Sequence, residues 1–163
     1  MPRRTQRYSK IGDTMKTIDL SGKWNYKTDI DDSQTIDSIK FENNNFNLPG
    51  STCDNQIGKK TEYFDKISKE AVRAPRERYE YIAPLWLQKT VNIPNDTDGK
   101  SIRLFMERVN IASELWIDGV KTDRQIIELS TPHIYNLTGK ITPGEHMFLS
   151  LIHISEPTRH AQI

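Results

Sequence analysis

The side chains most often used in catalysis are sparse in this sequence and do not fall into recognised catalytic spacings. The four histidines are 13 or 7 residues apart, and Cys53 is the only cysteine. A helical zinc site uses two histidines four residues apart, and a nucleophile elbow needs Gly-x-Ser-x-Gly. Neither pattern is present, and no glycine-rich phosphate loop is found. We therefore expect no metal site and no cofactor, and we expect Cys53 to be a buried thiol.

Carboxylates are abundant, but none can be paired from spacing alone. Glycoside hydrolysis needs two carboxyl groups about 5 to 9.5 Å apart, a distance that sequence does not reveal. Among 22 acidic residues, any single pair is best interpreted as solvated surface charge. The cluster of Asp29, Asp31 and Asp32 could suit calcium, but a solvated turn is the favoured interpretation.

A basic and aromatic cluster lies near the middle of the chain and could contact a ligand. Its members are Arg73, Arg76, Arg78, Tyr79 and Tyr81. Guanidinium groups and aromatic rings bind nucleic acid, and the same groups bind sugars by stacking and hydrogen bonding. The net charge of +1 gives no general attraction to nucleic acid. Packing of these loop residues on the domain remains the structural alternative.

A long segment without clear strand or helix pattern follows Pro49-Gly50. Residues 51–84 lack clear alternation, apart from a candidate helix over 63–72, and are longer than an ordinary connection. Such loops often carry binding residues.

His133 follows Pro132 at the start of an alternating segment, and we expect it to be a structural histidine that is hydrogen-bonded to the backbone.

The elements that would position these side chains are strands. Ile102, Leu104 and Met106 alternate with Arg103, Phe105 and Glu107, which is the period of a half-buried strand. A second apolar run ends at Asp118-Gly119, the dipeptide typical of a type I′ hairpin turn. The sequence therefore predicts an antiparallel sheet around this stretch.

Further strands are predicted on both sides of that stretch. They are expected as a pair within 17–29, and at 46–48, 85–93, 120–122, 126–129, 134–137 and from His146 onward. Roughly eight short strands with regular turn signals predict an all-β sandwich of jelly-roll or immunoglobulin type.

The length fits one domain, because 163 residues fall short of the ~250 needed for a (β/α)₈ barrel. The N-terminus is basic but lacks the apolar core of a signal peptide. Met15 is an alternative start, which would fit a cytoplasmic protein, and we expect residues 1–14 to form a disordered arm. No apolar window is long enough to predict a membrane span.

Several blocks, taken in order, resemble one family. They are Ile18 to Trp24, Leu48 to Thr52, Pro84 to Lys89, Leu104 to Val109, Leu115 to Gly119, Ser130 to Thr138 and Thr142 to Gly144. Together they resemble the N-terminal sugar-binding domain of glycoside hydrolase family 2, which includes β-galactosidases and β-glucuronidases. The resemblance implies a jelly-roll domain spanning residues 15–148.

The same resemblance implies a glycosidase whose catalytic glutamates lie in a (β/α)₈ barrel, after an immunoglobulin-like domain. No residue of this chain inherits a catalytic role, and the chain alone is expected to be inactive. Within the loop after Pro49-Gly50, side-chain chemistry suggests Asp54, Asn55, Arg78 and Tyr79 as substrate-binding residues. The expected partner is a carbohydrate, with no nucleic acid and no membrane. A stand-alone carbohydrate-binding module and a nucleic-acid-binding sandwich using 73–81 remain alternatives.

The C-terminal segment departs from the family pattern. Residues 149–159 resemble the in-frame translation of a sequencing-library adapter. We therefore expect native sequence to stop near Phe148, with 149–163 as a non-native tail on a truncated chain. The missing strand partners would then leave an exposed edge and favour aggregation.

Overall fold

The computed structural model describes residues 16–28, 36, 39–41, 45–60 and 79–153. These residues form strands and a short 3₁₀ helix, η3, at Asn95–Thr97. The strands are β1 (Gly22–Lys27), β2 (Phe46–Leu48), β3 (Lys59–Lys60), β4 (Tyr79–Glu80), β5 (Pro84–Ile93), β6 (Arg103–Met106), β7 (Ala112–Ile117), β8 (Val120–Lys121), β9 (Ile126–Ile127), β10 (His133–Asn136) and β11 (Gly144–His153). Within the part of the chain that is described, no helix is long and apolar enough to cross a membrane.

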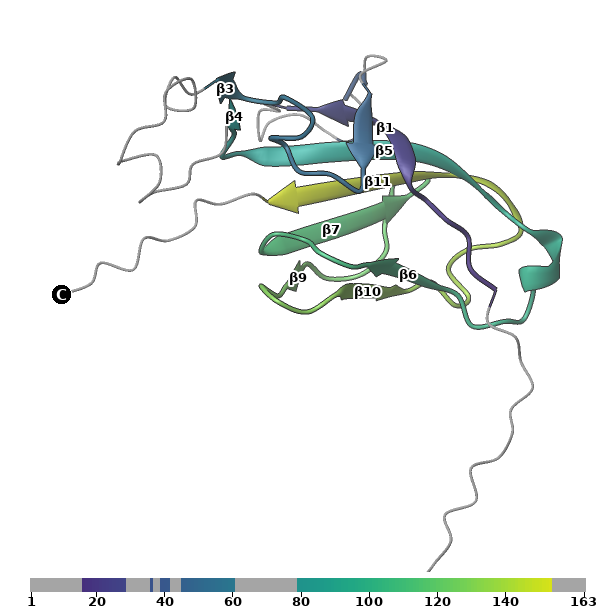
Figure 1. Cartoon of the computed structure of the whole chain (residues 1–163). Coiled ribbons are helices and arrows are strands. Elements are labelled where there is room, and N and C mark those ends of the chain that lie inside the picture. The colour runs from purple at the N-terminus through teal and green to yellow at the C-terminus, as the bar shows by residue number, and fades with distance from the viewer. Residues whose placement is uncertain (1–15, 29–35, 37–38, 42–44, 61–78, 154–163) are drawn as a thin grey trace, which may run out of the picture.

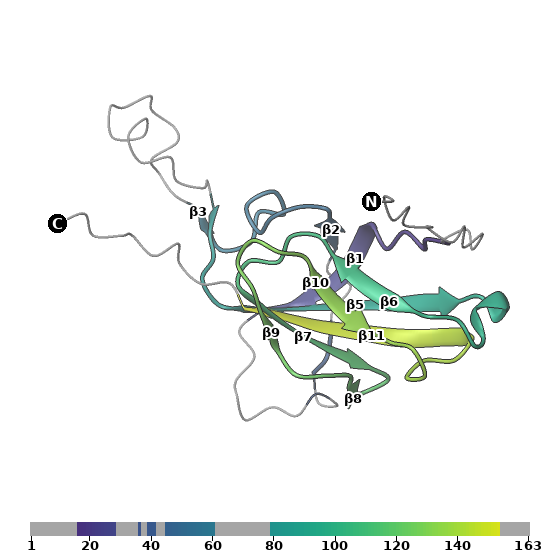
Figure 2. The ribbon, with the colours of Figure 1, turned by 90° about the horizontal axis from the view of Figure 1, so that it is seen from below.

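A large antiparallel sheet forms one layer of the molecule (Figure 1). Its strand order is β2-β1-β5-β11-β7-β8, and β9 also pairs with β7. The long strands β5 and β11 lie at its centre and pair along ten residues each, from Ile93 opposite Gly144 to Pro84 opposite His153. The small sheet β6-β10 lies across from it (Figure 2), and β3 and β4 form a separate two-stranded ribbon.

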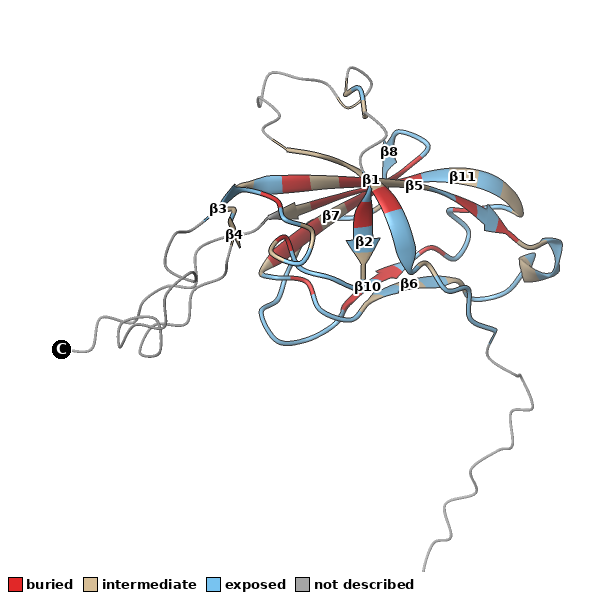
Figure 3. Ribbon diagram, turned by 45° about the horizontal axis from the view of Figure 1, so that its top comes forward, coloured by how far each residue is buried: buried red, intermediate tan, exposed pale blue. Residues whose placement is uncertain are grey.

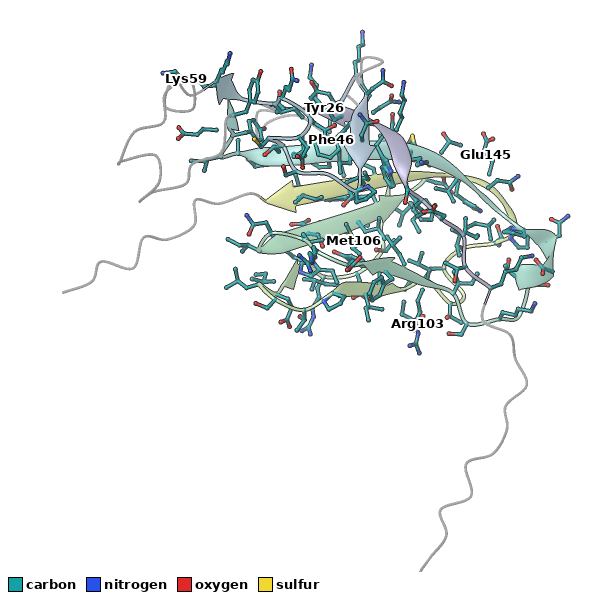
Figure 4. The ribbon with its side chains drawn as sticks, viewed as in Figure 1. Tyr26, Phe46, Lys59, Arg103, Met106 and Glu145 are labelled. Atoms are coloured by element: carbon teal, nitrogen blue, oxygen red, sulfur yellow. The ribbon has the colours of Figure 1, made fainter. Side chains whose placement is uncertain are left out.

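The main core lies between the large sheet and β6-β10. Alternation directs Leu104, Met106 and Tyr135 toward this core, whereas Arg103 and Phe105 are exposed. Figure 4 shows Met106 directed toward the large sheet and Arg103 directed away from it. The burial colours in Figure 3 follow this alternation along the strands. The core cluster consists of Val91, Ile93, Leu115, Ile117, Tyr135, Leu137, Ile141 and Phe148.

A second core lies at the other end of β5, under β1 and β2. Trp24, Phe46, Ile57, Leu85 and Leu87 form it. Lys89 also points to this side, and its ammonium group donates to the carbonyl oxygens of Leu20 (3.1 Å) and Ser21 (2.9 Å). The same ammonium lies 5.4 Å from the centre of the Trp24 ring. Lys89 therefore fixes the segment that precedes β1.

The opposite face of the large sheet carries a third cluster. Trp116, Leu149 and Leu151 are buried there, with Ile36, Phe41 and Trp86 packed against them. The rings of Trp86 and Trp116 are 5.2 Å apart, with an angle of 37° between their planes. Both faces of the central strands are thus covered by apolar side chains.

The structure confirms the predicted all-β sandwich. Asp118 and Gly119 have φ values of 50° and 80°, as a type I′ turn requires, and Ile117 pairs with Val120 across the turn. The prediction of two strands within residues 17–29 is wrong, because β1 is the only strand among the described residues 17–28, and Leu20 and Ser21 before it are held by Lys89 instead. The predicted helix at 63–72, the aspartate cluster at 29–32 and the N-terminal arm lie outside the described residues.

Candidate functional site

The loop that follows β2 is a single helical turn with a cap at each end. At its start, the Asp54 carboxylate accepts hydrogen bonds from the Ser51 amide and hydroxyl groups, both at 2.8 Å, and the Ser51 hydroxyl accepts one from the Asp54 amide at 3.1 Å. This reciprocal arrangement is a capping box. At its end, the amide groups of Gln56 and Ile57 donate to Cys53 and Thr52, with Gln56 at φ 56°. That pattern is a Schellman motif.

Asp54, one of the predicted substrate-binding residues, is exposed on this turn. The Ser51 backbone and side-chain hydrogen bonds hold the pKa of Asp54 below its usual value. The carboxylate is therefore ionised near neutral pH, and a ligand hydroxyl would have to share it with Ser51.

Asn55, a second predicted site residue, is used by the fold itself. Its side-chain oxygen accepts the Asn47 amide at 2.7 Å, and its side-chain nitrogen donates to the carbonyl oxygens of Asn47 (3.2 Å) and Ser51 (2.9 Å). Gly50 makes room for this contact, because a Cβ there would lie 2.7 Å from the Asn47 oxygen and 3.1 Å from the Asn55 side-chain nitrogen. Asn55 thus joins the loop to β2 as a strand partner would.

Tyr79 lies on β4, where it pairs with Lys60 of β3. β3 follows the loop directly and β4 pairs with β3 (Figure 1), so Tyr79 lies on the strand beside the one that continues from the loop of Asp54 and Asn55. Arg78, the fourth predicted site residue, lies outside the described residues. Gly58 closes the segment at φ 102°, and a Cβ there would lie 2.2 Å from the Glu80 carbonyl oxygen.

Tyr81, from the basic and aromatic cluster, packs against the second core and donates its hydroxyl hydrogen to the Pro84 carbonyl at 2.8 Å. This part of the cluster has a structural role. Arg73 and Arg76 lie outside the described residues. Cys53 is half-buried, so the expectation of a buried thiol is wrong: its turn lies at the surface and directs Thr52 and Ile57 inward instead.

A buried hydrogen-bond network joins β7 to β10. Ser113 and His133 are both 0% exposed, and the Ser113 hydroxyl lies 2.7 Å from His133 Nδ1. His133 Nε2 faces the Glu128 carbonyl at 3.0 Å and so carries a proton, which allows Nδ1 to accept the serine proton, and the Ser113 hydroxyl also lies 2.8 Å from the Tyr135 hydroxyl. The Tyr135 hydroxyl donates to the Ser113 carbonyl at 2.7 Å, and burial raises the pKa of Tyr135.

This network resembles a nucleophile and base only in its composition. No face of the serine or the imidazole reaches solvent, so a substrate has no access to either group. The prediction that His133 is a structural histidine bonded to the backbone is confirmed.

Two shallow hollows lie on the surface near β8 to β10. One, of about 360 Å³, is lined by Ile117, Val120, Lys121, Thr122 and Lys140. The other, of about 370 Å³, is lined by Asp123, Arg124, Ile126, Glu128, Thr131, Pro132, Ile134 and Tyr135. Among the described residues, no group of three or more histidine, cysteine or acidic side chains could hold a metal ion.

Comparison with known proteins identifies the fold. No family model and no curated protein matches the sequence. Among solved structures, β-glucuronidase from Faecalibacterium prausnitzii matches 83% of this chain and 20% of its own, with a TM-score of 0.58 and 18% identity. A Ruminococcus gnavus β-glucuronidase complexed with D-glucaro 1,5-lactone matches 83% of this chain and 21% of its own, with a TM-score of 0.61 and 14% identity. The Dictyoglomus thermophilum β-D-glucuronidase matches 82% of this chain and 19% of its own, with a TM-score of 0.53 and 17% identity.

The chain therefore shares the fold of one segment of these glycosidases and spans about a fifth of their length. At this identity the likeness concerns the fold alone. The capping box was visible in the sequence as Ser51-Thr-Cys-Asp54, a pattern that could have located the turn inside the segment predicted to be irregular.

Proposed function

We propose that the chain is the N-terminal jelly-roll domain of a family 2 glycoside hydrolase and acts as its accessory sugar-binding domain. The observation that carries this proposal is the match to β-glucuronidase structures over 83% of the chain. The ordered sequence blocks from Ile18 to Gly144 support the same family independently. Hydrolysis itself is assigned to a separate barrel domain of the parent enzyme, acting on O-glycosyl bonds.

Nitrophenyl β-glycosides test this proposal, with the glucuronide and the galactoside as the first substrates. The 163-residue chain should give no turnover, and the parent polypeptide with its downstream domains should hydrolyse at least one of them. Turnover by the chain alone, lost when one of its own carboxylates is replaced, would contradict the assignment. A parent polypeptide that hydrolyses no glycoside would also contradict it.

The predicted contacts of Asp54, Asn55 and Tyr79 with sugar belong to this proposal. Asp54 is the best placed of the three, because its carboxylate is exposed and ionised. In the parent enzyme, Asp54→Asn keeps the side-chain size and should raise KM if the carboxylate touches substrate. An unchanged KM would limit Asp54 to its capping role.

A stand-alone carbohydrate-binding module is the second candidate. The observation that favours it is Phe105, which is 59% exposed on the outer face of β6, with Arg103 on the same face. An exposed ring beside hydrogen-bond donors can stack on a sugar. Binding on a glycan array that is lost in Phe105→Ala would favour this candidate, and an absence of binding would count against it.

The nucleic-acid alternative is weaker in this structure. Tyr81 is partly buried against the second core and its hydroxyl is bound to the Pro84 carbonyl, which reduces the ring surface left for stacking on a base. Phosphate binding through the remaining arginines would show a steep dependence on salt. Affinity that does not change with salt would exclude it.

We also propose that residues 149–163 are a foreign tail, because 149–159 resemble a translated adapter. Against the proposal stands the sheet itself: residues 149–153 complete β11, pair with both β5 and β7, and bury Leu149 and Leu151. The buried Ser150 hydroxyl, which has no hydrogen-bond partner, is consistent with a segment not selected for this core. The codons for 149–159 test the idea directly, since codons unlike the adapter would remove it.

A further inference from the structure

The turn between β7 and β8 is attached to the start of β11 by a histidine. His146 Nδ1 lies 2.6 Å from a carboxylate oxygen of Asp118, and Nε2 lies 2.9 Å from the Thr142 carbonyl oxygen. The second carboxylate oxygen of Asp118 accepts the Met147 amide at 2.8 Å. The Asp118 amide donates to the Met147 carbonyl at 3.0 Å. One aspartate thus joins the turn to two consecutive residues of β11.

Both ring nitrogens of His146 face oxygens that can only accept a hydrogen bond. A carboxylate and a backbone carbonyl have no hydrogen to donate, so each nitrogen must carry its own proton. The geometry is satisfied in full only by the doubly protonated, positively charged ring. Loss of either proton would place a nitrogen lone pair against an oxygen lone pair.

His133 provides an internal contrast. One of its nitrogens also faces a carbonyl oxygen, but the other faces the Ser113 hydroxyl, which can supply the hydrogen. His133 therefore completes its hydrogen bonds with a single ring proton, whereas His146 does not.

Among the described residues, one charged group, the Asp118 carboxylate, is hydrogen-bonded to the His146 ring. The side chain is only 13% exposed, and its neighbour across the strand pair, Val91 of β5, is apolar. The loop before β11 contributes the Thr142 carbonyl, and the turn contributes the Asp118 carboxylate. Glu145 precedes His146 on β11 and is exposed on the other side of the strand. The bond to Asp118 raises the pKa of His146, and the bond from His146 lowers the pKa of Asp118.

We propose that Asp118, Thr142, His146 and Met147 form a pH-sensitive latch, which holds the β7-β8 turn on β11 when His146 is protonated and releases it when His146 loses a proton. The raised His146 pKa means that its stabilising effect is complete below about pH 6.5, the usual histidine value, and is lost as pH rises through the folded-state pKa. The lowered Asp118 pKa means that the carboxylate fails only in acid, as pH falls below its usual value of 3.8. The latch is therefore closed from the pH at which Asp118 ionises up to the folded-state pKa of His146.

Urea unfolding of the full chain at pH 5.5 and pH 8.0 tests the latch. The unfolding equilibrium constant of the unmodified chain should rise by roughly threefold or more between the two pH values. His146→Gln should remove most of that increase, because it removes the imidazole of the latch and leaves the rest of the chain unchanged. Lys140→Met is the matched control, because Lys140 donates to the Thr122 carbonyl at 2.6 Å just after the same hairpin, through an ammonium group rather than an imidazole.

A second readout keeps the test decisive if a variant folds poorly. In the unmodified chain, the NMR titration of the His146 ring and the protection factor of the Met147 amide, which corrects its exchange rate for the intrinsic effect of pH, should change with the same midpoint. A His146 ring that titrates without any change at Met147 would overturn the proposal. An identical pH dependence in His146→Gln and in the unmodified chain would also overturn it.

Discussion

Ser150 places a hydroxyl group inside the sandwich without a partner. The residue is 3% exposed on the central strand β11, and its oxygen makes no hydrogen bond. A buried unsatisfied hydroxyl costs about 1–3 kcal/mol. Ser150→Ala should therefore stabilise the chain by about 1 kcal/mol, measured as a higher urea midpoint with an unchanged slope.

Ser113 is the matched control, because it is a buried serine on the neighbouring strand β7 whose hydroxyl is hydrogen-bonded to His133. Ser113→Ala would leave His133 Nδ1 without its donor, and should cost about 2 kcal/mol. The two substitutions remove the same atom and should shift the midpoint in opposite directions. Equal shifts would mean that the hydrogen bonds of Ser113 do not stabilise the fold.

Gly58 is required by its surroundings as well as by its backbone angle. A Cβ would lie 2.2 Å from the Glu80 carbonyl, and φ is 102°. Gly99 also has a positive φ, of 69°, but a Cβ there would meet nothing within 4 Å. We expect Gly58→Ala to lower the free energy of unfolding by at least about 1 kcal/mol more than Gly99→Ala does, in parallel urea titrations.

Individual roles could be predicted from the sequence only where local chemistry decides them. The backbone bond of His133 followed from its position after Pro132, and the structure confirms it. The use of Asn55 as a partner for Asn47 could not be predicted, because it depends on how the loop returns to β2. The sugar contacts of Asp54, Asn55, Arg78 and Tyr79 stay predictions.

At the scale of elements, the loop after β2 depends on one amide side chain. Asn55→Ala removes three hydrogen bonds to Asn47 and Ser51, and should lower the free energy of unfolding by about 1–2 kcal/mol. Asn45→Ala, at an exposed asparagine two residues before Asn47, is the control and should have little effect. Thermal unfolding followed by circular dichroism measures both, and equal effects would contradict the role of Asn55.

The strands were predicted well where alternation and turn chemistry agreed, as at Asp118-Gly119. Which sheet each half of the stretch from Ser101 to Gly119 joins was harder to predict. Its two halves, β6 and β7, lie in different sheets and do not pair with each other. The chain changes sheets near Ile111, which has φ 74°, a conformation that β-branched residues rarely adopt. Local propensity argues against such a residue, so the crossing could not be inferred from the sequence.

At the scale of the whole molecule, β5 should make unfolding a single transition. Leu85 and Leu87 belong to one core, and Val91 and Ile93 belong to the other, so neither core can open without the strand that they share. We expect tryptophan fluorescence and far-ultraviolet circular dichroism to give the same urea midpoint. Two separate midpoints would show that the cores unfold independently.

The sandwich class was predictable because many short strands with regular turns have few other solutions. The unequal layers, with seven strands facing two among the described residues, were not predictable. They depend on pairing between β5 and β11, whose partner residues are 51 (Ile93 and Gly144) to 69 (Pro84 and His153) positions apart in the sequence, and on which strand edges remain unpaired. Pairing over such distances is decided by the whole core rather than by local pattern.

The tilted pair of Trp86 and Trp116 has an optical consequence. Two indole rings 5.2 Å apart, held at 37° by β5 and β7 with β11 between them, form a chiral arrangement of coupled chromophores. Such a pair should produce an exciton couplet in the circular dichroism of the indole bands, and replacement of either ring by phenylalanine should remove it. The exciton signal of this tryptophan pair should therefore report, without an added probe, whether β5, β11 and β7 keep their spacing.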